Sequence, residues 1–404
     1  MTHTYLTITP HDTVISRDNR PFGIGTRMKS LDWPNPSVLS GSVRTMIGKS
    51  NDPAFNPDTI SLLKDIAVSG PFALYEGQLF FRSPRDIAVR KFDDGKTQVY
   101  SIRPKELNKG EGVNMPDESI LPAMILDKGE GEDFKPSVIA PLWSYDLMTE
   151  WLADPDCNSF IVPDITDSKG TKVLNLPEKD PRVHVGINPE KGLSDEGMLF
   201  ETIGLDFSIK GNSRGIQVAA RLDDQGEYSE FVSNINSYHP FGGKRRLSHW
   251  KTVSEQKGWK CPEKVLSKLS KNTGLRMVLA TPAIFSGGWL PGWLKKNKGF
   301  YEGSPPGSPE NICIRLVGAC IERWNPLSGW SLEKVGPKPL RRMVSAGSVY
   351  FFEVISGEPA NLAKTLWLQP VSDIGEDKGQ NLLDGFGSAL WGAWDFGKKA
   401  NLVD

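Results

Sequence analysis

Residues 66–82 have the sequence IAVSGPFALYEGQLFFR, and this stretch decides the fold class. Its two apolar runs predict strands at 66–75 and 79–82, joined by a tight turn at the Glu-Gly pair between them. The preceding segment 37–47, SVLSGSVRTMI, places its apolar residues on one face of a helix. The alternating LTIT at 6–9 predicts a strand at the N-terminus. The order is therefore strand, helix, strand, strand.

A helix and further strands are predicted after this stretch. The segment SYDLMTEWL at 144–152 has the apolar spacing of an amphipathic helix. HVGI at 184–187 and MLFETIGLDFSIK at 198–210 predict strands. The polar, acidic, Gly- and Pro-containing stretch 104–136 predicts an insertion loop. The resulting order, β-α-β-β-α-β, is that of a ferredoxin-like unit.

A second unit of the same kind is traced more loosely after residue 210. Its predicted strands are 216–222, 275–285, 312–323 and 347–355, and its predicted helices are 262–271 and 359–367. We therefore expect an α+β protein of two tandem ferredoxin-like (RRM-like) domains with loop insertions. The predicted domains are residues 1–210, with the acidic insertion near 104–136, and residues 211–404.

Composition excludes several classes of protein. The 404 residues are 38% hydrophobic and 24% charged, which suits a globular chain of about two domains. No run approaches about 18 consecutive apolar residues, and the start, MTHTYLTITP, lacks the pattern of a secretory signal. The four cysteines, none at CxxC spacing, form neither a disulfide framework nor a structural zinc site. We expect a cytoplasmic protein without membrane, cofactor or metal.

Positive charge is concentrated in one segment of an otherwise mildly acidic chain. Residues 241–300 contain thirteen basic and two acidic residues, a net charge of +11, whereas the whole chain carries −1. The segment also contains four tryptophans, at 250, 259, 289 and 293. Cations interleaved with aromatics suit single-stranded nucleic acid, whose phosphates pair with Lys and Arg and whose bases stack on rings. A solvated lysine-rich helix beside ordinary core tryptophans explains the composition equally well.

Motifs of known chemistry fail on inspection. GSVRTMIGKS ends like a phosphate-binding P-loop, but six residues separate Gly41 from Gly48 where that loop needs four. GNSRG at 211–215 matches GxSxG, but a strand-like run follows it instead of a helix. The five histidines show no metal-ligand spacing. His239 and His249 flank a basic stretch, and a histidine there could act as a general base on a 2′-hydroxyl, although a surface or phosphate-contacting role is favoured.

Several segments together resemble one family. They are DTVISRDNRPFG at 12–23, PNPSVLSGSVR at 34–44, GPFALYEGQLFFRSPRD at 70–86, HVGINPEKGLSDEGMLF at 184–200, GGKRR at 242–246, TPAIFSGGWLPGW at 281–293 and RRMVSAGSVYFFE at 341–353. In this order they are similar to the RAMP proteins of CRISPR systems, and most closely to the third subunit of the type III-B (Cmr) effector module. The resemblance extends over residues 5–355.

The resemblance implies a fold, partners and a function. It implies a pair of ferredoxin-like domains that hold the 5′ handle of a CRISPR RNA. It also implies docking on the large polymerase/cyclase-like subunit and on the first backbone subunit of the complex. In this family the subunit is a non-catalytic cap, because target cleavage belongs to the backbone subunits and cyclic oligonucleotide synthesis to the large subunit.

The first predicted RNA site is the start of helix 37–47. Ser37 is the expected N-cap, and free N–H groups at a helix N-terminus bind phosphate. Small residues there, Ser40 and Gly41, let an RNA backbone come close. The cations expected to contact phosphate or base edges near this place are Arg17, Arg20 and Arg44. Taken alone, these residues favour a glycine that packs helix against sheet and arginines on a solvated face; the family resemblance shifts the prediction to RNA.

The second predicted site is the loop Gly242-Gly243-Lys244-Arg245-Arg246. Two glycines before three cations predict a flexible, cationic RNA-binding loop, although an exposed turn is the alternative. Trp289 and Trp293, in a loop framed by Gly and Pro, are expected to contact RNA or a neighbouring subunit. Burial in their own domain is the alternative for both rings.

Two other functions stay open at this point. One is a metal-independent endoribonuclease of the same superfamily that matures CRISPR RNA with a histidine. The other is a scaffold that makes no direct contact with RNA. The absence of an organised set of histidines and acids in the sequence favours the non-catalytic, handle-binding subunit.

Overall fold

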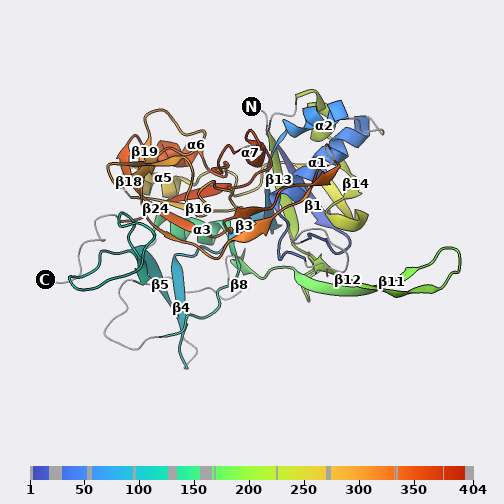
Figure 1. Cartoon of the computed structure of the whole chain (residues 1–404), viewed down its shortest axis with the longest axis horizontal. Helices are drawn as coiled ribbons and strands as arrows, with labels where there is room; N and C mark the ends of the chain where they lie inside the picture. Colours follow the sequence, from blue (N-terminus) through green and yellow to red (C-terminus); the bar gives the residue numbers. More distant parts are fainter. Residues whose placement is uncertain are drawn as a thin grey trace.

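The fold is mixed α/β and rests on several antiparallel sheets, the two largest having eight and six strands. The computed structural model describes residues 3–17, 30–51, 57–93, 97–125, 134–154, 166–167, 170–223, 226–269, 274–331, 333, 335–375 and 377–395. In Figure 1 the first sheet lies to the right and the second to the left. No helix within the described ranges has the length and apolar character needed to cross a membrane.

The eight-stranded sheet gathers strands from widely separated parts of the chain. Its order is β10-β7-β3-β2-β13-β1-β15-β14, and every pair in it is antiparallel. The strands are β1 (His3–Pro10), β2 (Ala67–Tyr75), β3 (Gln78–Arg82), β7 (Leu142–Ser144), β10 (Val173–Leu174), β13 (Gln217–Asp223), β14 (Asn236–Pro240) and β15 (Leu247–Val253). Because β13 lies between β1 and β2, the β1-α1-β2 connection is a split βαβ unit.

Helices α1 (Pro36–Asn51) and α2 (Pro57–Lys64) pack together beside this sheet, and α1 contacts β2. Leu39 and Val43 of α1 are fully buried in the same core cluster as Leu6 and Ile8 of β1. The predicted strands at 66–75 and 79–82 and their turn are confirmed. In the turn both Glu76 and Gly77 have positive φ, as a two-residue hairpin requires.

The strands expected from HVGI and from MLFETIGLDFSIK exist, but not in this sheet. They are β11 (Glu178–Ile187) and β12 (Ser194–Asp206), which pair with each other in a two-stranded ribbon. Figure 1 shows this ribbon extending away from the body of the molecule. The sequence placed this segment as the fourth strand of the first unit. That placement is wrong, because β11 and β12 pair with each other and not with the sheet, and within the described part of the chain only Leu205 of β12 forms a further bridge, to Val14. Strand β13 lies in the sheet instead.

The two large sheets divide the chain at a different point from the one expected. Strands β13, β14 and β15, which lie beyond residue 210, complete the first sheet. The second sheet begins only at Gly274, and its order is β17-β18-β19-β24-β16-β25. Its strands are β16 (Gly274–Leu279), β17 (Leu294–Asn297), β18 (Phe300–Gly303), β19 (Cys313–Cys320), β24 (Val349–Ser356) and β25 (Ala389–Ala393). The boundary near 210 is therefore wrong as a division between sheets.

Helices α5 (Glu263–Leu269) and α6 (Pro359–Thr365) cover the second sheet and contact β25. Helix α3 (Tyr145–Ala153), whose N-cap Ser144 accepts from the Leu147 N–H, contacts α5 and β25 as well as β3 and β7. The helix that the sequence assigned to the first unit therefore also covers the second sheet. Trp151 of α3 is fully buried in the larger core cluster.

The remaining elements are short. They are β4 (Ile87–Lys91), β5 (Thr97–Pro104), β6 (Ala123–Ile125), β8 (Thr166–Asp167), β9 (Gly170–Thr171), η1 (Gly226–Tyr228), α4 (Ser229–Ser233), η2 (Gly243–Arg245), β20 (Asn325–Leu327), β21 (Trp330–Ser331), β22 (Gly336–Pro337), β23 (Arg341–Met343) and α7 (Gln380–Leu383). Strands β4, β5 and β6 form a small sheet, so the described part of the insertion expected at 104–136 carries the strand β6.

A buried ionic cluster joins elements of both large sheets. Asp86, fully buried after β3, accepts from Arg276 of β16 and, at 3.2 Å, from Arg103 of β5. The Trp151 indole N–H donates to the other Asp86 oxygen at 2.9 Å. Two guanidinium groups thus share one carboxylate in the protein interior, and the cluster fixes β16 against β3 and α3.

Candidate nucleic-acid interface

A groove of about 580 Å³ runs along α1 and brings together residues far apart in the sequence. Its walls come from Arg17, from α1, from the segment 239–243 and from the arm 327–341, which comprises the short hairpins β20–β23 and β21–β22. Four of the residues expected to bind RNA line it: Arg17, Ser37, Gly41 and Gly243. The first turns of α1 and the glycines of the loop 242–246 therefore lie on two sides of one groove.

Helix α1 presents small residues to this groove. The helix begins at Pro36, so Ser37 lies in its first turn and is not the N-cap that the sequence predicted. Gly41 is exposed, and a Cβ added there would meet no atom within 4 Å. The alternative that Gly41 packs helix against sheet is therefore wrong. Ser40 is 1% exposed and lies outside the groove, so its expected contact with RNA is not available in this structure.

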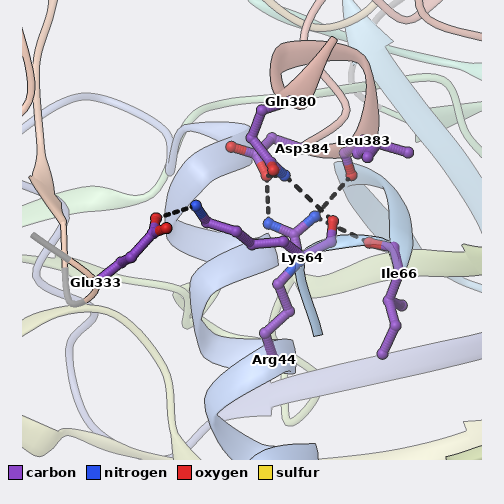
Figure 2. A network of polar contacts seen from close by, with 7 residues as sticks. All are labelled: Arg44, Lys64, Ile66, Glu333, Gln380, Leu383 and Asp384. Atoms are coloured by element: carbon purple, nitrogen blue, oxygen red, sulfur yellow. Dashed lines mark hydrogen bonds and ion pairs between the residues drawn. The ribbon is translucent and has the colours of Figure 1, made fainter. Parts of the chain in front are cut away.

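Arg44 reaches toward α7, as Figure 2 shows, and does not line the groove, although its partner Asp384 does. Its Nη1 forms an ion pair with Asp384, and its Nη2 donates to the carbonyls of Ile66 at 2.9 Å and Leu383 at 3.2 Å. The Arg44 and Asp384 side chains are 11% and 6% exposed. Arg44 thus joins the first sheet's helix to the C-terminal segment, and the structure contradicts its placement at the RNA surface.

Figure 2 also shows how the arm is tied to this junction. Gln380 Nε2 donates to Asp384 at 3.1 Å and to the Lys64 carbonyl at 3.3 Å, and Lys64 forms an ion pair with Glu333 of the arm. Of the other two arginines expected near α1, Arg17 lines the groove, whereas Arg20 lies outside the described residues.

The loop 242–246 is held in place and is not the flexible segment that the sequence predicted. Gly242 has φ +79°, and a Cβ there would stand 2.6 Å from the Ile15 carbonyl oxygen. The Gly243 N–H donates to that same oxygen at 2.7 Å. Lys244 and Arg245 follow with φ of 61° and 55°, a left-handed conformation that is uncommon outside glycine and often marks functional sites. The glycines allow close packing, which turns the cations outward.

The three cations of this loop line a second cavity of about 520 Å³ between the loop and the ribbon β11–β12. The Lys244 Nζ stands 5.7 Å from the centroid of the Phe200 ring, which stacks on His184. Arg246 forms an ion pair with Asp12, whereas Lys244 and Arg245 are exposed and form no ion pair within the described part of the chain. Ile15 lines both cavities, so they adjoin across the loop.

Other cationic and aromatic groove residues were missed by the sequence interpretation. They are Lys49, Trp330, Lys338 and Arg341. Arg341 forms an ion pair with Asp377 at 3.0 Å, while Lys338 has no such partner among the described residues. Arg341 belongs to the RRMVSAG segment noted above, but Trp330 and Lys338 carry no motif. Only the folding of the arm over α1 brings them to the groove.

The loop that carries Trp289 and Trp293 lies elsewhere and packs on its own domain. The Trp293 indole N–H donates to the Val371 carbonyl at 3.0 Å, and the Trp289 carbonyl accepts from Tyr350 at 2.6 Å. Asp373 accepts from the backbone N–H groups of the loop at Ser286 and Gly292. Both rings are half-buried against the larger core cluster and line none of the cavities described here. The alternative of burial in the home domain describes them better.

His239 is the histidine that faces the groove. Burial lowers its pKa, so the ring is neutral at pH 7, and its Nε2 lies 2.9 Å from the Ser237 hydroxyl. No group of three or more His, Cys, Asp or Glu side chains in the described ranges is arranged to hold a metal ion. The described polar side chains that line the groove and cavity are mainly cations, serines and histidines, and the two carboxylates among them, Asp384 and Asp12, form ion pairs with Arg44 and Arg246.

Comparison with protein families settles the relationship of the chain. The family model described as CRISPR-associated protein (Cas_Cmr3) matches residues 6–394. The chain belongs to this family. The resemblance to the third subunit of the type III-B (Cmr) module is thereby confirmed, and the family places the chain among subunits of type III CRISPR effectors.

Solved structures similar to this family member share little sequence with it. One is described as the cryo-EM structure of the Type III-B Cmr-beta bound to cognate target RNA, with a TM-score of 0.46, 12% identity and 86% of each chain covered. Another is described as the crystal structure of the Csm3-Csm4 subcomplex in the type III-A CRISPR-Cas interference complex. It has a TM-score of 0.35 and 12% identity, covering 87% of this chain and 94% of that one. Comparison with curated proteins gives no match.

Proposed function

We propose that this subunit binds the 5′ handle of CRISPR RNA in the groove along α1 and in the adjoining cavity at loop 242–246. The observation that carries the proposal is the convergence of Arg17, Ser37, Gly41 and Gly243 on one groove. Lys49 and Lys338 add positive charge to the same walls. A groove lined by cations, small residues and one exposed tryptophan suits a phosphate backbone with stacked bases.

Gly41 provides the test of the groove. Gly41→Leu should fill open space and lower the affinity for handle-containing RNA about tenfold or more, because one charged hydrogen bond contributes about 1.5–3 kcal/mol. Gly41→Ala should raise the stability of the free chain by up to about 1 kcal/mol, since alanine favours an exposed helix interior. Ser61→Leu, at an exposed position of α2 outside the groove, is the matched control. Unchanged RNA affinity in Gly41→Leu would reject the groove.

The cationic loop provides an independent test. Each phosphate neutralised on a single strand contributes about 0.7 to the slope of log affinity against log salt. Lys244→Ala combined with Arg245→Ala should therefore flatten that slope by up to about 1.4 units, similarly for different RNA sequences. The control is Lys264→Ala with Lys268→Ala, which removes the same charge from exposed positions of α5. Equal slopes in the two variants would contradict the role of the loop.

The proposal includes docking on the large polymerase/cyclase-like subunit and on the first backbone subunit. The ribbon β11–β12 supports a protein interface, because aliphatic side chains protrude on one of its faces. Val183, Ile187 and Leu199 are 67%, 64% and 71% exposed. In the antiparallel register Val185 pairs with Leu199, so these side chains lie on the same face, while His184 and Phe200 face the 520 Å³ cavity. An exposed apolar face of this kind is typical of an interaction site.

The proposal also includes the absence of catalysis by this subunit, and His239 is the observation that favours the alternative nuclease. A neutral imidazole in the groove could accept a proton from a 2′-hydroxyl. Its Nε2 contacts the Ser237 hydroxyl, and among the described residues no acidic side chain is hydrogen-bonded to the ring. We expect the chain alone to leave a CRISPR repeat RNA intact. A cleavage product that disappears in His239→Ala or His249→Ala would establish the nuclease instead.

The tandem ferredoxin-like interpretation is supported by strand order. In the first sheet, β15-β1-β13-β2 places the first strand between the third and the last. In the second sheet, β25-β16-β24-β19 repeats this arrangement, although a loop and the hairpin β17–β18 stand where the first crossover helix would be. Two such units would divide between β15 and β16.

A further inference from the structure

The outer face of β14 and β15 carries a row of polar and aromatic side chains beyond the groove. Tyr238 of β14 pairs with His249 of β15 in the antiparallel register, so both side chains lie on the same face. On β15 the flanking residues Ser248 and Trp250 are 1% and 0% exposed, which places the inner face on the core. Tyr238 is 56% exposed, so its ring stands on the solvent side.

Three rings form a ladder on this face. The Tyr238 ring centroid lies 5.1 Å from that of His249 and 5.1 Å from that of His11, with interplanar angles of 51° and 63°. The His249 Nε2 lies 3.0 Å from the Asn236 amide oxygen, which orients that ring. His11 also lines the 520 Å³ cavity together with Lys244 and Arg245. The row of three rings therefore adjoins the cationic loop 242–246 through His11.

The charge around the ladder has one sign. Residues 236–251 contain no aspartate or glutamate, and they contain four lysines and arginines. Lys251 pairs with Asn236 in the register and is exposed on the same face as the rings. Asp12, the acid beside the cavity, is engaged with Arg246 and, at 3.3 Å, with Arg182. A polyanion can thus approach the ladder without passing an unpaired carboxylate of this segment.

We propose that His11, Tyr238 and His249 form a stacking platform for bases of a single-stranded RNA segment that continues from the cationic loop. The proposal rests on the proposed function, because it extends the RNA path from the cavity along the sheet. Exposed rings beside cations are the combination that binds single strands without reading their sequence. A protein interface core is instead depleted of charge, and the row of exposed aliphatic side chains lies on the ribbon β11–β12, with Leu247 the one exposed aliphatic residue of β15.

The test compares two strands with the same phosphate chain, a short oligoadenylate and its abasic counterpart. Tyr238→Ala in the full-length chain should lower the affinity for oligoadenylate about 5- to 150-fold, the range expected for the loss of one stacked base. Its affinity for the abasic strand and its salt slope should stay unchanged, since stacking releases no counterion. Tyr238→Phe should bind like the parent. Phe300→Ala, which removes an exposed ring on the second sheet, is the matched control.

Each other outcome overturns the platform. If Tyr238→Ala binds both strands like the parent while Lys244→Ala with Arg245→Ala flattens the salt slope, the platform is wrong and the proposed function stands. If neither variant changes RNA binding, both the stacking platform and the proposed function are rejected. An equal loss on the abasic strand assigns Tyr238 to the phosphate chain or to the local structure, and a lowered melting temperature identifies the latter. Loss of association with a protein subunit when RNA is absent would assign the face to a protein partner.

Discussion

Replacing Arg44 by alanine should unfold the free protein at a lower temperature and leave the groove along α1 intact. The guanidinium of Arg44 neutralises Asp384 and donates to the Ile66 and Leu383 carbonyls, as Figure 2 shows. Removing it leaves a carboxylate that is 6% exposed without its counter-charge. Breaking a buried ion pair by removing one partner costs about 3–5 kcal/mol.

The expected change in melting temperature follows from that cost. For chains somewhat smaller than this one, 1 kcal/mol shifts the melting temperature by about 2–4 °C. Taking about 2 °C per kcal/mol, Arg44→Ala should melt roughly 6–10 °C below the parent. Arg44→Lys should lie in between, because an ammonium group keeps the charge but cannot reach all three acceptors in the planar geometry of a guanidinium.

Lys49 on the same helix provides the matched contrast, since it is exposed and lines the groove. Lys49→Ala removes the same charge, and its stability should stay within about 0.5 kcal/mol of the parent while RNA affinity falls. Thermal unfolding followed by circular dichroism, together with RNA titration of the folded chain, separates the two roles. A double-mutant cycle with Asp384→Asn should give a coupling energy above about 1 kcal/mol. An Arg44→Ala variant that melts like the parent and binds RNA weakly would refute the structural role.

Two further predictions concern buried groups. Asp86→Asn should destabilise the chain by about 3–5 kcal/mol in urea unfolding, because it strips the counter-charge from two buried guanidiniums; parent-like stability would contradict the cluster. Burial raises the pKa of Cys261 to about 12, so alkylation of this thiol at pH 8, read by peptide mapping to separate it from the other cysteines, should be slow until urea is added. Since the folded pKa is raised, this thiol's contribution to stability should be complete below about pH 8.5 and decline above it; rapid alkylation of the folded chain would refute the burial.

Local signals in the sequence predicted elements well where neighbouring residues determine them. The β2–β3 hairpin followed from its turn pair, α1 from its apolar spacing and α3 from the same kind of pattern with Ser144 before it. The partner of β1 could not be predicted in this way, because β13 and β15 lie more than 200 residues away. Alternating patterns in β11 and β12 indicate strands but do not say which sheet they join.

The candidate site likewise combines residues that local sequence patterns predicted with residues that only the folded chain brings together. Small residues on α1 and the cations after Gly242-Gly243 were visible as local compositions, and the structure brings both to adjoining cavities. The direction of Arg44 depends on a carboxylate 340 residues later, which no local pattern reveals. Lys338 and Trp330 reach the groove only through the arm. No sequence motif surrounds these two residues, so they could not be predicted as site residues.

The position of β1 has a consequence for synthesis of the protein. This strand is made first, yet its two neighbours are β13 and β15, and the last of these ends at Val253. At about 5–20 residues per second, the ribosome needs roughly 12–50 s after finishing β1 before that partner exists. Until β13 is complete at Asp223, Leu6 and Ile8, fully buried in the finished sheet, have neither neighbouring strand beside them, and β15 follows only at Val253. A nascent chain stopped at residue 210 lacks both neighbours of its first strand, so the N-terminal sheet closes late and only after the ribbon β11–β12 has emerged.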